Sequence, residues 1–226
     1  MNELLDLLWQ RSVLLLDFDG SVCSVFSGLS GREAADTLVK EINLPVPEGI
    51  ARTRDPFDVL HYAASLGRAT GERIERRFAE IEVEAVRSAQ ATPYFGNFMR
   101  LVDQTHYETC VVTNNSSEAV SVYIAAHDEL PDYLRHSIFG RTMINVPLLK
   151  PNPYLLTRAI EFTQETPDQC VFIGDSVSDI QAARAASVAV IALANCPEKL
   201  QLFAEYAPDA VVTTMHTLSE AVSYML

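Results

Sequence analysis

The chain has 226 residues, of which 48% are hydrophobic and 21% charged, so it can bury a sizeable core without disulfides or a structural metal. Its 17 basic residues stand against 30 acidic ones, and the net charge of −13 disfavours binding to the phosphate backbone of nucleic acids. Acidic residues interrupt the N-terminal segment early, and no apolar run approaches the roughly 20 residues of a membrane span. We therefore expect no signal peptide, no contact with a membrane and a cytoplasmic location.

Apolar runs that end in polar residues alternate with amphipathic segments along most of the chain. Continuous apolar runs of this length are typical of strands that are buried on both faces of a parallel sheet. They occupy residues 12–17, 109–113, 170–173, 188–193 and, more weakly, 210–213. Helical spacing predicts helices over 96–106, 117–126, 153–160, 178–186 and 217–226. The alternation predicts an α/β fold with a doubly wound parallel sheet and right-handed crossovers.

One long stretch, residues 25–91, breaks this alternation and contains no run typical of a buried strand. Amphipathic patterns predict helices over 34–42, 56–65 and 72–89, and a proline-punctuated loop separates the first two. The stretch has the size of a small helical domain. We therefore predict an α-helical cap of residues 25–91, inserted into a core made of residues 1–24 and 92–226.

Distinctive polar residues follow three of the predicted strands, and one lysine precedes a predicted helix. They are Asp17 and Asp19, Thr113 and Asn114, Asp175 and Asp179, and the lysine is Lys150. The carboxyl ends of parallel strands meet at one edge of a sheet, where ligands bind. Clustered carboxylates repel each other unless a cation lies between them, and all-oxygen ligands suit Mg²⁺. Lys150, the Thr113 hydroxyl and backbone N–H groups suit a phosphate, so the pattern favours phosphoryl transfer over acyl transfer or redox chemistry.

These segments resemble the four motifs of the haloacid dehalogenase-like hydrolase superfamily. Residues 17–22 (DFDGSV) resemble the first motif, 112–116 (VTNNS) the second, 150–151 (KP) the third and 174–179 (GDSVSD) the fourth. The four motifs occur in order over essentially the whole chain, and the position of the insertion is similar to the phosphoglycolate-phosphatase-like branch with a helical cap. Two residues depart from the usual pattern: Ser21 stands where the family has threonine, and Ser187 stands where an Ala-Gly pair often ends a helix.

The resemblance implies a role for each of these residues in a Mg²⁺-dependent phosphatase. Asp17 would be the nucleophile that forms an aspartyl-phosphate, and Asp19 the general acid and base. The metal would bind an Asp17 oxygen, the Asp19 backbone carbonyl and Asp175, with Asp179 acting directly or through a water. Thr113, the Asn114 backbone and Lys150 would hold the phosphoryl oxygens. The substrate would be a small phosphorylated metabolite.

Several alternatives stay open at this point. A phosphomutase of the β-phosphoglucomutase type would use the same intermediate, and a catalytically silent binding or regulatory member would keep the fold alone. Asp17 and Asp19 also occur in an Asp-Gly context that is common in simple turns. The sequence does not fix the oligomeric state or the substrate.

Four cap residues and the four cysteines lie outside these motifs. Arg52, Arg54, His61 and Tyr62 are compatible with surface or packing positions, but the two arginines are also suited to bind a carboxylate or second phosphate of the substrate. No cysteine lies in a CxxC pair or in a zinc-binding pattern. We expect the four cysteines to be reduced and buried or inert, including Cys23 beside the first motif.

Overall fold

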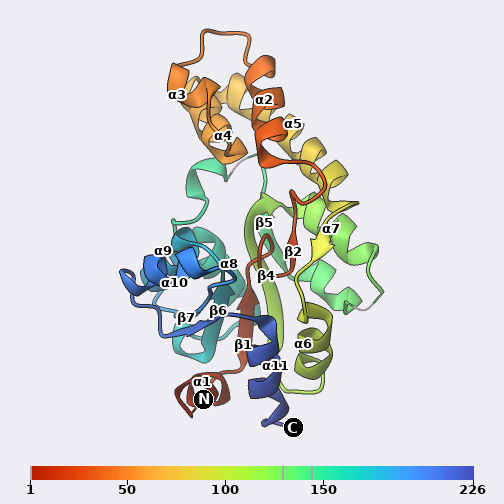
Figure 1. The fold of residues 1–226 in the computed structure, drawn as a ribbon, viewed down its shortest axis with the longest axis vertical. Coiled ribbons are helices and arrows are strands. Elements are labelled where there is room, and N and C mark those ends of the chain that lie inside the picture. The colour runs from red at the N-terminus through yellow and green to blue at the C-terminus, as the bar shows by residue number, and fades with distance from the viewer. Residues whose placement is uncertain (1, 129, 144) are drawn as a thin grey trace.

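The computed structural model describes residues 2–128, 130–143 and 145–226, and it contains a six-stranded parallel sheet (Figure 1). The strand order is β5-β4-β1-β6-β7-β8. The strands are β1 (Val13–Leu16), β4 (Glu108–Ser116), β5 (Ile138–Arg141), β6 (Cys170–Gly174), β7 (Ala189–Leu193) and β8 (Ala210–Val212). β1 lies between β4 and β6, so the chain crosses over at the centre of the sheet, where ligands bind in open α/β folds.

The side chains of β1 show why the sheet needs helices on both faces. All four of its residues are buried. Leu14 and Leu16 belong to one hydrophobic cluster, and Val13 and Leu15 belong to another. Successive side chains of a strand point to opposite faces, so an uninterrupted apolar run requires a helical layer on each side. This confirms the predicted α/β fold with a doubly wound parallel sheet.

Helices from distant parts of the chain build the two layers. The first cluster takes side chains from α1 (Asn2–Trp9), α6 (Phe95–Val102), α7 (Ser117–Ala125) and α11 (Met215–Ser223). The second cluster takes them from α8 (Tyr154–Thr163), α9 (Val177–Ala185) and α10 (Pro197–Ala204). Short 3-10 segments, η1 (Asp132–His136), η2 (Val146–Leu148) and η3 (Pro167–Gln169), lie in the connections. None of the described helices is long and apolar enough to cross a bilayer.

Residues 31–86 form a group of helices at one end of the molecule, away from both termini (Figure 1). They are α2 (Gly31–Glu41), α3 (Glu48–Ala51), α4 (Pro56–Ser65) and α5 (Arg68–Val86). A two-residue antiparallel ribbon of β2 (Cys23–Ser24) and β3 (Gln90–Ala91) pairs the two segments that connect this group to the core. We keep residues 25–91 as the proposed extent of the cap.

Some elements differ from the sequence prediction. α5 begins at Arg68 rather than at residue 72, and α1, α3, β5 and α10 had not been predicted. β5 has the sequence IFGR, in which a glycine and an arginine interrupt the apolar run that would have marked a strand. α10 buries only Phe203, so it lacks a clear apolar stripe.

Candidate active site

All seven predicted site residues line one cavity of about 370 Å³. It lies at the carboxyl ends of the central strands, and the first turns of α4 contribute to its wall. The core residues that the sequence singled out are Asp17, Asp19, Thr113, Asn114, Lys150, Asp175 and Asp179. A cavity of this size suits a small ligand. The prediction that strand-end residues converge is therefore confirmed, and their chemical roles stay predictions.

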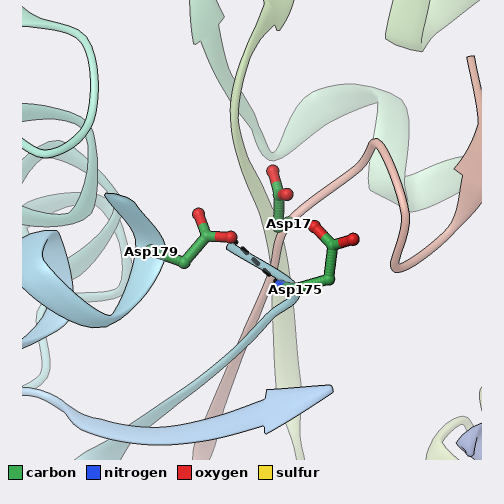
Figure 2. A group of neighbouring side chains, drawn as sticks. All are labelled: Asp17, Asp175 and Asp179. Atoms are coloured by element: carbon green, nitrogen blue, oxygen red, sulfur yellow. Dashed lines mark hydrogen bonds between the residues drawn. The ribbon is translucent and has the colours of Figure 1, made fainter. Parts of the chain in front are cut away.

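Three carboxylates point toward a common space in this cavity (Figure 2). Asp17, Asp175 and Asp179 each offer an oxygen within 4.8 Å of the others. Gly20 allows Asp175 to approach, because its φ of +86° suits glycine and a Cβ there would lie 2.0 Å from an Asp175 oxygen. The DFDG turn therefore needs its glycine both for its backbone conformation and for space.

Lys150 lies among these carboxylates and is almost completely buried. Its Nζ donates to Asp17 Oδ1 at 2.7 Å, to Asp179 Oδ1 at 2.5 Å and to the carbonyl oxygen of Val112 at 3.1 Å. Burial alone would lower the pKa of Lys150, but Asp17 and Asp179 together raise it to about 12. The lysine is therefore a fixed positive charge beside Asp17.

Asp179 uses both of its oxygens within the protein. Oδ1 accepts from Lys150, while Oδ2 accepts from the Ser176 hydroxyl at 2.7 Å and from the backbone N–H groups of Asp175 and Ser176. Ser176 and Asp179 also form the capping box of α9, so the start of that helix fixes the carboxylate. Asp179 therefore orients Lys150 and the turn at Asp175. This favours a role for Asp179 in positioning the residues around a metal rather than in binding the metal directly.

Burial shifts the pKa of both aspartates in the first motif. Burial, and then the neighbouring Asp179, raise the pKa of Asp17 to about 8 against the opposing effect of Lys150. Burial raises the pKa of Asp19 to about 6, although the backbone N–H of Val25 donates to its Oδ1 at 2.9 Å and opposes the shift. Values near neutral pH are common for groups that move protons in active sites.

These carboxylates fit a hard divalent cation. Burial also raises the pKa of Asp175, and Lys199 donates to its Oδ2 at 2.5 Å. Burial disfavours the ionised form of these carboxylates, and a bound cation would stabilise that form. The candidate metal ligands are all oxygen atoms, which hard cations prefer. The residues present therefore fit Mg²⁺, with Asp17 and Asp175 as the carboxylates available to it.

The side chains of the second motif, Thr113 and Asn114, form hydrogen bonds within the protein that the sequence did not predict. The Asn114 side chain donates to the Lys150 carbonyl oxygen and accepts from the Lys150 N–H, at 3.0 and 2.8 Å, so it positions the backbone of the lysine. The Thr113 hydroxyl donates to Asn115 Oδ1 at 3.0 Å. The Lys150–Pro151 peptide bond is cis.

The sequence reasoning missed a buried ionic network that connects the cap to the second motif. Glu82 of α5 accepts from Asn115 Nδ2 at 2.9 Å and from the Ser116 N–H at 3.1 Å. Arg141, at the end of β5, donates to Glu82 at 2.6 Å, to Glu75 at 3.3 Å and to the Asn114 carbonyl oxygen at 3.1 Å.

A signal for this network was present in the sequence. Glu75 and Glu82 lie seven residues apart, and both are buried on the same helix as Ile74, Phe78 and Ile81. Two acidic residues within the apolar stripe of an amphipathic helix indicate buried partners. The partner Arg141, by contrast, lies 59 residues after Glu82 in a strand that was not predicted.

The cap residues do not lie as the sequence suggested. Arg52 is exposed and pairs with Glu48 at 2.8 Å, and neither Arg52 nor Arg54 is among the described residues that line the cavity. The expectation that these arginines face the substrate is therefore not supported. Tyr62 donates to the carbonyl oxygen of Pro45 at 3.2 Å, a packing role, whereas His61 does line the cavity.

The structure shows the surroundings of Cys23 and of the two residues that depart from the family pattern, Ser21 and Ser187. Cys23 is buried, and burial raises the pKa of its thiol, which makes it unreactive. Ser21 is fully buried, and its hydroxyl lacks a hydrogen-bond partner within the described part of the chain. Ser187 has a φ of +59°, a left-handed conformation in which glycine is usual.

Comparison with known proteins agrees with this geometry. The haloacid dehalogenase-like hydrolase family matches residues 13–187. A phosphoglycolate phosphatase of Pseudomonas savastanoi pv. phaseolicola is 26% identical over 220 residues, covering 91% of this chain and 78% of its own length. One from Nitrosococcus oceani is 23% identical and covers 96% of this chain and 99% of its own.

Solved structures share the fold. A predicted phosphoglycolate phosphatase from Haemophilus somnus aligns over 96% of this chain and 99% of its own with a TM-score of 0.67 at 20% identity. A predicted phosphatase from Clostridium acetobutylicum aligns over 95% of this chain and 99% of its own, with a TM-score of 0.72 at 11% identity. Together with the four motifs, the family match and the curated relatives confirm that the chain belongs to the haloacid dehalogenase-like hydrolase family, in its phosphoglycolate-phosphatase-like branch.

Proposed function

We propose that this hydrolase is a Mg²⁺-dependent phosphatase that cleaves a small phosphomonoester through a phosphoryl group carried on Asp17. The observation that carries the proposal is the contact between Asp17 and the buried ammonium of Lys150, 2.7 Å apart at the base of a cavity. A carboxylate beside a fixed positive charge is suited to attack phosphorus, since the cation offsets the charge of the incoming phosphoryl group. The relatives named phosphoglycolate phosphatases support the same class of reaction.

In the first step an Asp17 oxygen bonds to phosphorus while the bond from phosphorus to the ester oxygen breaks, and Asp19 gives its proton to the leaving alcohol. In the second step Asp19 takes a proton from a water, whose oxygen bonds to phosphorus and releases phosphate and Asp17. A pKa of about 6 lets Asp19 exchange a proton in both directions near neutral pH. Lys150 holds the phosphoryl oxygens throughout, and the Thr113 hydroxyl joins it by exchanging its hydrogen bond to Asn115 Oδ1 for one to a phosphoryl oxygen.

A bound Mg²⁺ would be held by Asp17, the Asp19 backbone carbonyl and Asp175, and it would supply positive charge next to the phosphoryl group. Asp179 orients Lys150 and the turn that carries Asp175. The Asn114 side chain fixes the backbone of Lys150, so the second and third motifs act as one unit.

Two alternatives remain distinct from this proposal. A phosphomutase would return the phosphoryl group to a substrate and would release little inorganic phosphate. A silent binding protein would lack turnover, and the presence of both Asp17 and Asp19 disfavours it.

The test is release of phosphate from p-nitrophenyl phosphate by the purified chain, with Mg²⁺ and then with excess chelator. We expect turnover that chelation abolishes and added Mg²⁺ restores. Full activity in excess chelator would refute the dependence on a metal. Absence of turnover with Mg²⁺ would refute the phosphatase function.

A further inference from the structure

The wall of the active-site cavity that faces the sheet is acidic. It is formed by the N-terminal half of α4, which contributes Asp55, Phe57, Asp58 and His61. Including the core residues, the described lining contains six aspartates but one lysine, one histidine and no arginine. Lys150, the one lysine, is already bound to Asp17 and Asp179 at the base of the cavity.

Local contacts fix the two α4 carboxylates in place. Asp55 is the N-cap of α4, and its Oδ1 accepts from the Phe57 N–H at 2.8 Å. Asp58 Oδ2 accepts from the Thr53 hydroxyl at 2.5 Å. Each carboxylate uses one oxygen in this way and keeps the second for other donors. The positions of these charges follow from the helix start itself.

This arrangement sets a condition on the substrate. A phosphomonoester brings about two negative charges, which Lys150 and a divalent cation can offset at the base of the cavity. A second anion on the organic part would then lie toward Asp55 and Asp58, with no lysine or arginine of the described lining to receive it. An ammonium or hydroxyl group in the same place would find charged acceptors, and hydrogen bonds to charged groups are the stronger ones.

We propose that the organic part of the natural substrate presents ammonium or hydroxyl donors to Asp55 and Asp58 and carries no second anionic group. This inference rests on the phosphatase function proposed above and narrows its substrate class. The proposed substrate differs from the one in the names of the curated relatives, because phosphoglycolate carries a carboxylate whose carbon lies two atoms from the ester oxygen.

Three esters of equal carbon number provide matched probes: 2-phosphoglycolate, 2-hydroxyethyl phosphate and O-phosphoethanolamine. Each is measured as a competitive inhibitor of p-nitrophenyl phosphate hydrolysis, so the result does not depend on how well each alcohol leaves. For the wild-type protein we expect phosphoglycolate to be the weakest inhibitor, with an inhibition constant about tenfold or more above that of phosphoethanolamine. The hydroxyethyl ester should lie nearer to phosphoethanolamine.

The double variant Asp55→Asn/Asp58→Asn tests the assignment of the two residues. Asparagine caps helices as well as aspartate does, and both aspartates are exposed, so we expect the fold to persist. An unchanged melting temperature of the double variant checks this. We expect the ratio of the phosphoglycolate and phosphoethanolamine inhibition constants to fall about tenfold or more. Asp36→Asn, the same change on α2 outside the cavity, should leave this ratio unchanged.

The outcomes separate the two proposals. Wild-type protein that does not hydrolyse p-nitrophenyl phosphate contradicts the phosphatase function itself. If the wild-type protein hydrolyses that ester, the phosphatase function stands and the substrate class can still fail. Any one of four results overturns the substrate class: equal inhibition constants, no inhibition by any of the three esters, a preference for phosphoglycolate, or a ratio that the double variant does not change.

Discussion

Glu82 of α5 and Arg141 at the end of β5 form a completely buried ion pair, with 2.6 Å between Oε2 and Nη2. The Arg141 guanidinium also lies over the Phe78 ring, 4.2 Å from its centroid. Glu82 in turn accepts from Asn115 and Ser116 of the second motif. The cap helix α5 is thus bonded directly to the end of β4, the strand that carries Thr113, and the ion pair connects the two parts of the molecule.

Removing one member of this pair should destabilise the protein strongly. Glu82→Leu leaves the Arg141 charge buried with Glu75 alone, and a broken buried pair typically costs about 3–5 kcal/mol. Urea unfolding measures the change. The matched control is Glu161→Leu, which removes an exposed pair with Arg158 and should change the stability by less than about 1 kcal/mol. Equal effects of the two substitutions would contradict the role of the buried network.

Asp19→Asn should separate the acid role from other roles of this residue. An asparagine cannot protonate the leaving alcohol, so turnover of an alkyl phosphate should fall by roughly 10²–10⁴. The loss should be smaller for p-nitrophenyl phosphate, whose leaving group needs little protonation. Steady-state kinetics on both esters give the two losses. Equal losses would argue against proton donation by Asp19.

The raised pKa values of Asp17 and Asp19 predict how the stability of the metal-free protein depends on pH. The folded-state pKa values of about 8 and about 6 lie above the ordinary value of 3.8, so between pH 4 and 8 the folded state binds more protons than the unfolded state. Stability from these groups is therefore fully present below about pH 4 and is lost as the pH rises through 6 and 8.

The melting temperature in chelator, measured from pH 5 to 8, tests this dependence. Asp17→Asn has no proton to lose at that position, so its melting temperature should fall less over this range than that of the wild type. Mg²⁺ binds ionised carboxylates, so added Mg²⁺ should raise the wild-type melting temperature more at pH 8 than at pH 5. Parallel curves for the two proteins in chelator would contradict the raised pKa of Asp17.

Ser187 offers a stabilising substitution. The residue is exposed and has a φ of +59°, which costs a side chain roughly 1–2 kcal/mol. Ser187→Gly removes this strain but adds freedom to the unfolded chain, so we expect a net gain of about 0.5–1 kcal/mol in urea unfolding. Ser223→Gly at the end of α11 serves as the control and should not stabilise the protein.

The sequence predicted those parts of the site that depend on local patterns. Asp17 and Asp175 directly follow buried apolar runs, and the parallel sheet then brings the strand ends together. Lys150 and Asn114 were predicted as separate phosphate-binding groups, but the structure also bonds them to each other. That contact joins residues 36 positions apart, and no local pattern encodes it.

The cap was harder to predict because its surface depends on how the helices pack. The sequence could locate the proline-rich loop before α4, and its two arginines were the conspicuous charges. The structure instead places Asp55 and Asp58 in the cavity wall, since α4 begins there, and Arg52 pairs with Glu48 on the outside. Which charge of a loop faces a cavity is decided by the direction of the next helix, a tertiary property.

The most direct test of the proposed chemistry is the turnover of p-nitrophenyl phosphate by Asp17→Asn beside the wild type, both with saturating Mg²⁺. Asparagine keeps the shape of the side chain but removes the attacking charge, so turnover should fall by several orders of magnitude while the melting temperature is maintained. Asp36→Asn, the same change far from the cavity, should keep wild-type turnover. If Asp17→Asn keeps more than about a tenth of the wild-type turnover, a loss of less than about 1.4 kcal/mol, then Asp17 is not the nucleophile.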